Sequence, residues 1–165
     1  MGDDMQLATD KTENKTATGL PRYWPLLFPL TYLVHIAEEY YGGFPNWSSR
    51  FLGFHLTPEG FLQLNAVAWM VMLGVSAAAT RYASLRWLVV PFAVATFING
   101  CAHAIASVIT ASYSPGVISG LTLWFPLGVI TLRRSYRHVP HRVFWIGVGL
   151  GALLHVVVTV LAIAG

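Results

Sequence analysis

His35-Ile36-Ala37-Glu38-Glu39 lies in an apolar run that extends from about residue 20 to residue 41. The run therefore holds two adjacent carboxylates beside a histidine, although the chain beyond Glu13 has only one other acidic residue, Glu59. A carboxylate in hydrocarbon is costly unless it is paired, hydrated or bound to a cation. The surroundings of these two carboxylates are thus the central question about this protein.

The composition indicates an integral membrane protein. Of the 165 residues, 55% are hydrophobic and 10% are charged, whereas soluble domains average about 25% charged residues. We expect a single multi-pass domain in the cell (plasma) membrane, with membrane lipid as its main partner. The one cysteine, Cys101, excludes a disulfide framework and a cysteine-based zinc site. The basic residues flank the apolar runs and form no patch, so we expect no nucleic-acid partner.

The apolar runs predict an all-α bundle of five transmembrane helices. Each run has about 20 residues, which is enough to cross a hydrocarbon core of about 30 Å. The predicted helices span residues 20–41, 59–80, 87–111, 116–132 and 143–164. Residues 1–19 are polar and are expected to be a disordered cytoplasmic segment, ahead of a transmembrane domain at residues 20–165. Residues 42–58 are predicted to form an aromatic loop with a short helix near 47–54, and residues 133–142 a basic loop.

The basic residues predict the orientation. Five spans put nine of the ten on one side of the membrane and leave only Arg50 on the other. Because positive charge is retained in the cytoplasm, the N-terminus is expected to be cytoplasmic and the C-terminus outside. The nine residues are Lys11, Lys15, Arg22, Arg81, Arg86, Arg133, Arg134, Arg137 and Arg142.

Polar residues within the predicted helices fall at similar depths and on shared faces. Helical spacing places His35, Glu38 and Glu39 on one face of the first helix. A stripe at three- and four-residue steps runs along the third helix, and single polar residues occur in the second and fifth. We therefore expect a polar pocket near the outer leaflet. The other members of this set are Thr31, Asn65, Asn99, His103, Ser107 and His155.

These residues resemble the HXXEE family of small helical membrane proteins. The motif is present as His35-Ile36-Ala37-Glu38-Glu39, and the family's N-x-x-x-H pattern corresponds to Asn99 and His103. A later Pro-Gly segment is similar at Tyr113-Ser114-Pro115-Gly116. The resemblance implies a membrane topology and a clustering of these residues, and it implies no reaction.

The first functional hypothesis is a mononuclear divalent-metal site for zinc, iron or manganese. Histidine and carboxylate are donors that these metals accept, and a cation would neutralise the adjacent carboxylates. Such a metal could activate water or dioxygen against a lipidic or small apolar substrate. Glu38 and Glu39 are the predicted catalytic residues. The candidate ligands are His35, Glu38, Glu39, His103 and His155, and the candidate second-layer or substrate residues are Asn99, Asn65, Thr31, Ser107 and Tyr113.

Three alternatives stay open. Metal-free acid–base catalysis would suit an isomerase or cyclase of an apolar substrate. A transport or sensor protein that handles protons or cations would also place ionisable residues in a membrane, although the polar residues here fade toward the cytoplasmic half. A structural polar cluster is the third. Small-x3-small spacings at Gly116/Gly120 and Gly147/Gly151 leave room for a homo-oligomer. The sequence leaves enzymatic activity undecided and favours a metal-dependent membrane enzyme.

Overall fold

The computed structural model describes residues 18–164, which form helices joined by short links and contain no strand. The predicted disordered segment lies almost entirely outside the described residues. The long helices are α2 (Leu27–Tyr41), α4 (Pro58–Arg81), α5 (Val89–Ile109), α7 (Phe125–His138) and α8 (His141–Ala164). The shorter elements are η1 (Trp24–Leu26), α3 (Phe44–Leu52), η2 (Ala83–Leu88), α6 (Val117–Ser119) and the π-helical turn η3 (Gly120–Trp124).

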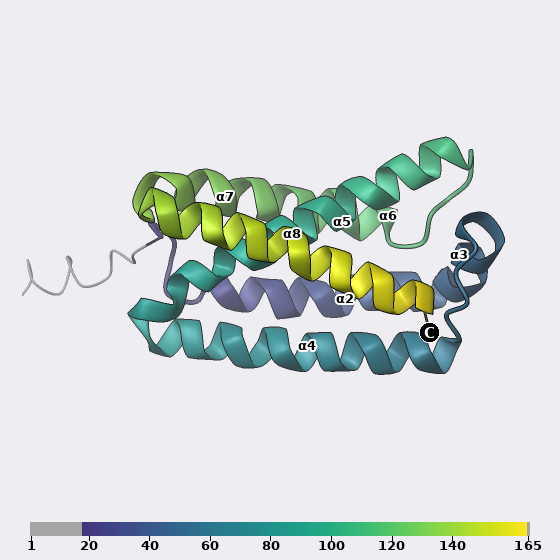
Figure 1. Ribbon diagram of the computed structural model, residues 1–165, viewed down its shortest axis with the longest axis horizontal. Coiled ribbons are helices and arrows are strands. Elements are labelled where there is room, and N and C mark those ends of the chain that lie inside the picture. The colour runs from purple at the N-terminus through teal and green to yellow at the C-terminus, as the bar shows by residue number, and fades with distance from the viewer. Residues whose placement is uncertain (1–17, 165) are drawn as a thin grey trace, which may run out of the picture.

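The long helices run along one common axis (Figure 1). Helix α5 packs against both α7 and α8, and α2 packs against α4. Helix α3 lies at the end of the bundle where the C-terminus and the α5–α6 link are also found (Figure 1). The opposite end holds the start of the described chain, η2 and the α7–α8 link. The all-α prediction is confirmed.

The number of candidate membrane spans is three among residues 18–164, and the prediction of five was wrong in this respect. The three are Pro58–Arg81, Ala83–Ile109 and His141–Ala164. Helix α2 has only 15 residues, because the chain around Pro25 forms the separate 3-10 turn η1. The predicted fourth span, residues 116–132, is divided by η3, and the helix α7 that contains its last part continues beyond it through Arg133, Arg134 and Arg137.

Helix boundaries follow from local signals at two places. The Thr57 side chain accepts a hydrogen bond of 3.0 Å from the backbone N–H of Gly60, and Pro58 occupies the first helical turn, so α4 begins as its sequence predicts. Residues 133–138, expected as part of a basic loop, instead continue α7. The helix ends at His138 because Val139 precedes Pro140 and is extended.

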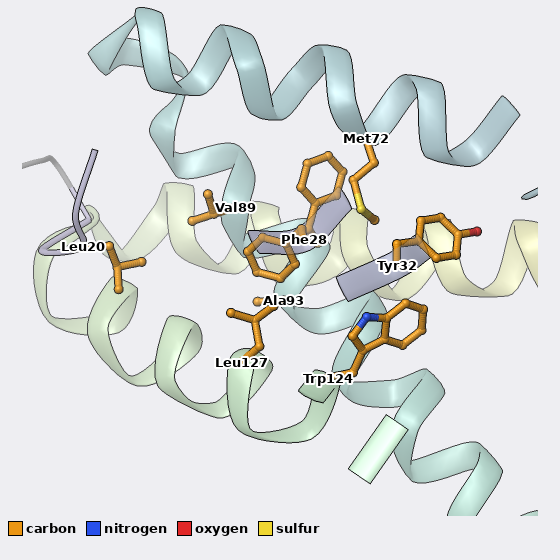
Figure 2. Close-up of a cluster of buried hydrophobic side chains, with 9 residues drawn as sticks. Leu20, Phe28, Tyr32, Met72, Val89, Ala93, Trp124 and Leu127 are labelled. Atoms are coloured by element: carbon orange, nitrogen blue, oxygen red, sulfur yellow. The ribbon is translucent and has the colours of Figure 1, made fainter. Parts of the chain in front are cut away.

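The core is built where α2, α4, α5 and the η3–α7 segment meet. Figure 2 shows Phe28, Tyr32, Met72 and Trp124 directed toward one another from these elements. The rings of Tyr32 and Trp124 lie 5.4 Å apart, centroid to centroid. This cluster joins the end of η3 to the interior of α2, and thereby fixes η3, the segment that follows α6, beside α2.

Small residues bring α5 close to its neighbours within the chain. A Cβ atom added at Gly151 would lie 2.5 Å from the Pro91 carbonyl oxygen, and one added at Gly100 would lie 2.7 Å from the Gly120 carbonyl oxygen. The small-residue spacing in α8 therefore serves contacts with α5 of the same chain. A homo-oligomer stays a prediction without support from these glycines.

Candidate functional site

Three buried side chains from α2 and α5 converge near the α3 end of the bundle. The Nε2 atom of His103 lies 3.2 Å from Glu39 Oε1, and Nε2 of His35 lies 3.6 Å from the same oxygen. The three donor atoms all lie within 4.8 Å of one another. His35 is 1% exposed, and Glu39 and His103 are each 6% exposed. We call these three residues the His–Glu–His cluster.

Each histidine ring is held at its other nitrogen by a serine hydroxyl. The Nδ1 atom of His35 lies 2.8 Å from Ser119 Oγ, and that of His103 lies 3.0 Å from Ser114 Oγ. A hydrogen bond at Nδ1 fixes the ring and selects which nitrogen is free to act. Both rings therefore present Nε2 to Glu39, and His35 Nε2 has no hydrogen-bond partner among residues 18–164.

Aromatic rings hold the cluster from its flanks. The His35 ring stacks on Trp124 with 3.8 Å between centroids and 27° between planes. The His103 ring contacts Phe44 of α3 at 5.6 Å. Trp124 is the last residue of the π-helical turn η3, and such turns change the direction in which the following side chains point. The turn thus brings Trp124 against the histidine.

Glu38 has a different set of partners from Glu39. One carboxylate oxygen accepts hydrogen bonds from the Tyr113 hydroxyl at 2.7 Å and from the backbone N–H groups of Gly116 and Ile118 at 3.1 and 2.9 Å. The other accepts from the Ser119 N–H at 2.6 Å. Partial burial and the bond to Glu38 raise the pKa of Tyr113 to about 12, so its hydroxyl stays a donor at neutral pH. Glu38 therefore fixes residues 113–119, which we call the strap.

The strap crosses directly over the cluster at Gly116. This residue has a backbone φ of +100°, a value that residues with a side chain rarely adopt. A Cβ atom there would lie 2.8 Å from His103 Cε1 and 2.9 Å from His35 Cε1. The Ser107 hydroxyl accepts a 3.0 Å hydrogen bond from the Ser114 N–H and so ties the strap to α5. Glycine at position 116 thus lets the backbone close over both imidazoles.

A cavity of about 100 Å³ adjoins the cluster. His35, Glu39 and His103 line it together with apolar side chains from α3, α4 and α8. The other polar side chains that line the cavity are those of Tyr32, Asn65, Asn99 and Thr159. A small molecule or a group at the end of a larger one can therefore reach the cluster from this space.

The predicted site residues fall into two groups. His35, Glu39 and His103 come together, with Asn65 and Asn99 lining the adjoining cavity. The Asn65 side chain accepts a 2.8 Å hydrogen bond from the Tyr32 hydroxyl. Outside the cluster, Glu38, Tyr113 and Ser107 hold the strap, Thr31 donates to the Leu27 carbonyl oxygen, and His155 lines a larger cavity beside α4 and α8.

Sequence reasoning missed the residues that orient the cluster. Ser114 lies within the Tyr113–Gly116 segment that resembles the family, and this resemblance was the available signal for it. Ser119 and Trp124 carried no signal, because only the strap and η3 bring them to His35. Tyr32 is one turn before His35 on α2 and could have been included by helical spacing.

The cluster fits the requirements of a divalent cation. Ligand atoms about 2.1 Å from one tetrahedral zinc ion are about 3.4 Å apart. The two nitrogen–oxygen distances of 3.2 and 3.6 Å are close to this value, and all three ligand atoms lie within 4.8 Å of one another. Two imidazoles and one carboxylate are the donor set of several catalytic zinc and non-haem iron sites. The orphaned Nε2 atom of His35 is available as a ligand.

The comparisons with known proteins agree with the motif. A family model described as "Protein of unknown function with HXXEE motif" matches residues 26–131. This range includes α2, the His–Glu–His cluster and the strap. No curated protein and no solved structure matches the chain.

Proposed function

The chain belongs to the HXXEE family, and we propose that it is a membrane enzyme that binds one divalent cation through His35, Glu39 and His103. The substrate is lipidic or a small apolar molecule. The observation that carries the proposal is the convergence of two Nε2 atoms on one buried carboxylate oxygen, with each Nδ1 already engaged by a serine. A structural cluster needs no such matched orientation of two rings.

The electrostatics support a cation at this position. In the tautomer in which each neutral imidazole donates from Nδ1 to its serine, both Nε2 lone pairs face the Glu39 carboxylate, so three acceptors converge at a buried site. Such an arrangement requires a proton or a metal ion between the acceptors. Among residues 18–164, no lysine or arginine forms an ion pair with Glu39. A divalent cation would satisfy all three acceptors together.

Three protein ligands would leave a coordination position for a reactant. This is the pattern of catalytic sites, whereas structural zinc sites use four protein ligands. A cation held in this way supplies Lewis acidity and can activate water or dioxygen. The chain contributes the orientation of both imidazoles through Ser114 and Ser119, and exclusion of solvent through the strap. Zinc, iron and manganese all accept these donors.

The membrane setting of the proposal rests on the three apolar helices and on the basic end of the bundle. Arg22 donates to the Thr80 carbonyl oxygen at 3.0 Å, and η2 and the α7–α8 link lie at the same end (Figure 1). We place this end in the cytoplasm of a multi-pass plasma-membrane protein. The cluster then lies toward the outer leaflet, and the C-terminus is outside.

Metal analysis tests the proposal. Full-length protein purified in detergent without chelators should carry about one divalent ion per chain, and chelation should lower its melting temperature because bound metal stabilises the folded state. His103→Ala should lose the ion. His138→Ala should retain it, because His138 is exposed at the far end of α7. A wild-type protein without stoichiometric metal, whose melting temperature ignores added zinc, iron and manganese, would refute the proposal.

Metal-free acid–base catalysis is the second candidate. It is favoured by the 3.2 Å separation of His103 Nε2 and Glu39 Oε1, which is also suitable for a shared proton. This alternative predicts a melting temperature that is insensitive to chelators and a conversion of substrate that continues in their presence. The same metal analysis therefore separates the two candidates.

A further inference from the structure

A second and larger cavity extends from the cluster along the membrane-facing helices. It has a volume of about 270 Å³ and lies between α4, α5 and α8. Five residues line both this cavity and the smaller one beside the cluster, so the two cavities adjoin. We call the larger cavity the groove. The shared residues are Tyr32, Leu64, Asn99, Trp124 and Val158.

The groove lies between two helices that are long and apolar enough to span a membrane. Val71 of α4 and Leu154 of α8 line it and are 58% and 38% exposed. Their neighbours Met70 and Leu153 do not line it and are each 58% exposed. Side chains so apolar and exposed face lipid when these helices cross a membrane. The groove is therefore open to hydrocarbon rather than to water.

The lining of the groove suits the part of one alkyl chain that lies next to its polar end. Along α8 the lining runs from Leu154 to Leu161, a rise of about 10 Å at 1.5 Å per residue. Four polar side chains also line the groove. They are Tyr32 from α2, Thr96 and Asn99 from α5, and His155 from α8. The Oδ1 atom of Asn99 is buried and has no hydrogen-bond partner within the described chain. A polar group that arrives through the groove would find an acceptor at the entrance to the cluster.

We propose that the groove holds the hydrocarbon chain of a single-chain amphiphile that enters sideways from the lipid between α4 and α8. The polar end of the molecule lies at Asn99 and faces the His–Glu–His cluster. This inference rests on the proposed function, for which it defines the substrate class as a long alkyl or prenyl chain with a small polar end. Because the surrounding lipid is as apolar as the groove, only the fit of the chain to the groove distinguishes this site from the bilayer.

Photo-crosslinking tests the proposal. Full-length protein in vesicles of dioleoyl phosphatidylcholine is irradiated with hexadecanol that carries a diazirine in its chain. Labelling of α4 and α8 peptides should be saturable and should be displaced by plain hexadecanol. Val71→Trp and Leu154→Trp fill the groove and should reduce this competed labelling several-fold. Met70→Trp and Leu153→Trp add the same bulk on the adjacent outward positions and should leave it unchanged.

Labelling that is not displaced by hexadecanol, or that is equal in all four variants, would overturn the groove proposal. Metal content is measured on the same samples to keep the two proposals apart. Normal metal content with unspecific labelling refutes the groove alone. Competed, groove-dependent labelling in a wild-type protein without metal supports the groove and refutes the cation. Labelling in Glu39→Gln should persist, because Glu39 does not line the groove.

Discussion

Adjacent carboxylates on α2 have separate tasks. Neighbouring residues on a helix point about 100° apart, so Glu39 shares the face of His35 while Glu38 is directed at the strap. Glu38 is satisfied by one hydroxyl and by backbone N–H groups, and Glu39 faces two imidazoles. The cost of a buried carboxylate is thus offset in two different ways within one dipeptide.

Glu39→Gln and Glu38→Gln should therefore affect different properties, metal binding and fold stability respectively. Glu39→Gln removes the anionic ligand and should abolish stoichiometric metal. Glu38→Gln should retain the metal but lower the free energy of unfolding by about 2 kcal/mol, because it weakens charge-assisted hydrogen bonds. Metal analysis and thermal unfolding of both variants in one detergent measure the two effects. Loss of metal from Glu38→Gln together with its retention in Glu39→Gln would contradict the assignment.

Ser114 and Ser119 should control the affinity of the site without being ligands. Removing the hydroxyl that orients a metal-bound histidine typically lowers affinity about 10–100-fold. Ser114→Ala and Ser119→Ala should each show this loss in competition with a chelator of known affinity. Ser76→Ala is the matched control, since Ser76 is equally buried in α4 and does not line the cavity beside the cluster. Equal metal affinities in all three variants would show that Ser114 and Ser119 do not orient the histidines for metal binding.

The residues of the cluster were predictable to different degrees. Helical spacing and a buried charge were sufficient to select His35, Glu39 and His103 from the sequence. The same reasoning grouped Glu38 with them, because spacing of three and four residues places side chains on one broad face. The partners of Glu38 are mostly backbone N–H groups of the strap. Almost every residue type has a backbone N–H, so the sequence cannot show which of them will donate.

At the scale of elements, the strap and the π-helical turn supply the side chains that orient the His–Glu–His cluster of the long helices. Helices α2 and α5 supply the cluster, but the serines and the stacked tryptophan come from residues 114–124. The sequence predicts a plain helix over 116–132, because no residue type is specific for a π-helical turn. The close approach of Gly100 and Gly120 places this segment against α5, a pairing that requires knowledge of the fold.

Gly116→Ala should damage the site, whereas Gly43→Ala should only destabilise the fold. Both glycines have positive φ, so alanine costs about 1–2 kcal/mol at either position. Only at Gly116 would the added Cβ meet the imidazoles, since nothing lies within 4 Å of a Cβ at Gly43. Metal titration should show weaker binding in Gly116→Ala and normal binding in Gly43→Ala. Identical titrations would show that the strap does not confine the cluster.

At the scale of the whole molecule, the arginines of η2, α7 and the start of α8 lie at one end of the bundle and the His–Glu–His cluster lies nearer the other. The apolar runs correctly located three of the long helices, α4, α5 and α8. The number of candidate spans did not follow, because span length depends on where Pro25 and the π-helical turn interrupt the helices. Hydropathy averages over such breaks and therefore counted five.

Cysteine labelling of whole cells should place the two ends on opposite sides of the membrane. In a Cys101→Ala background, Ser49→Cys on α3 should react with an impermeant maleimide from outside. Arg137→Cys on α7 should react only after the membrane is opened, because the basic end is retained in the cytoplasm. Both positions are exposed in the fold. The reverse pattern would invert the proposed orientation.

The hydrogen bonds of Glu38 also impose an order on biosynthesis. Every partner of Glu38 lies at residues 113–119, and Glu39 meets its second histidine at residue 103. A ribosome therefore completes α2, with His35 as the only one of these partners already made, long before it makes His103 and the strap. Until α5 and the strap emerge, Glu38 has none of its hydrogen-bond donors and Glu39 has only one of its two histidines. The final packing of α2 against α5 and the strap is thus a late event of translation.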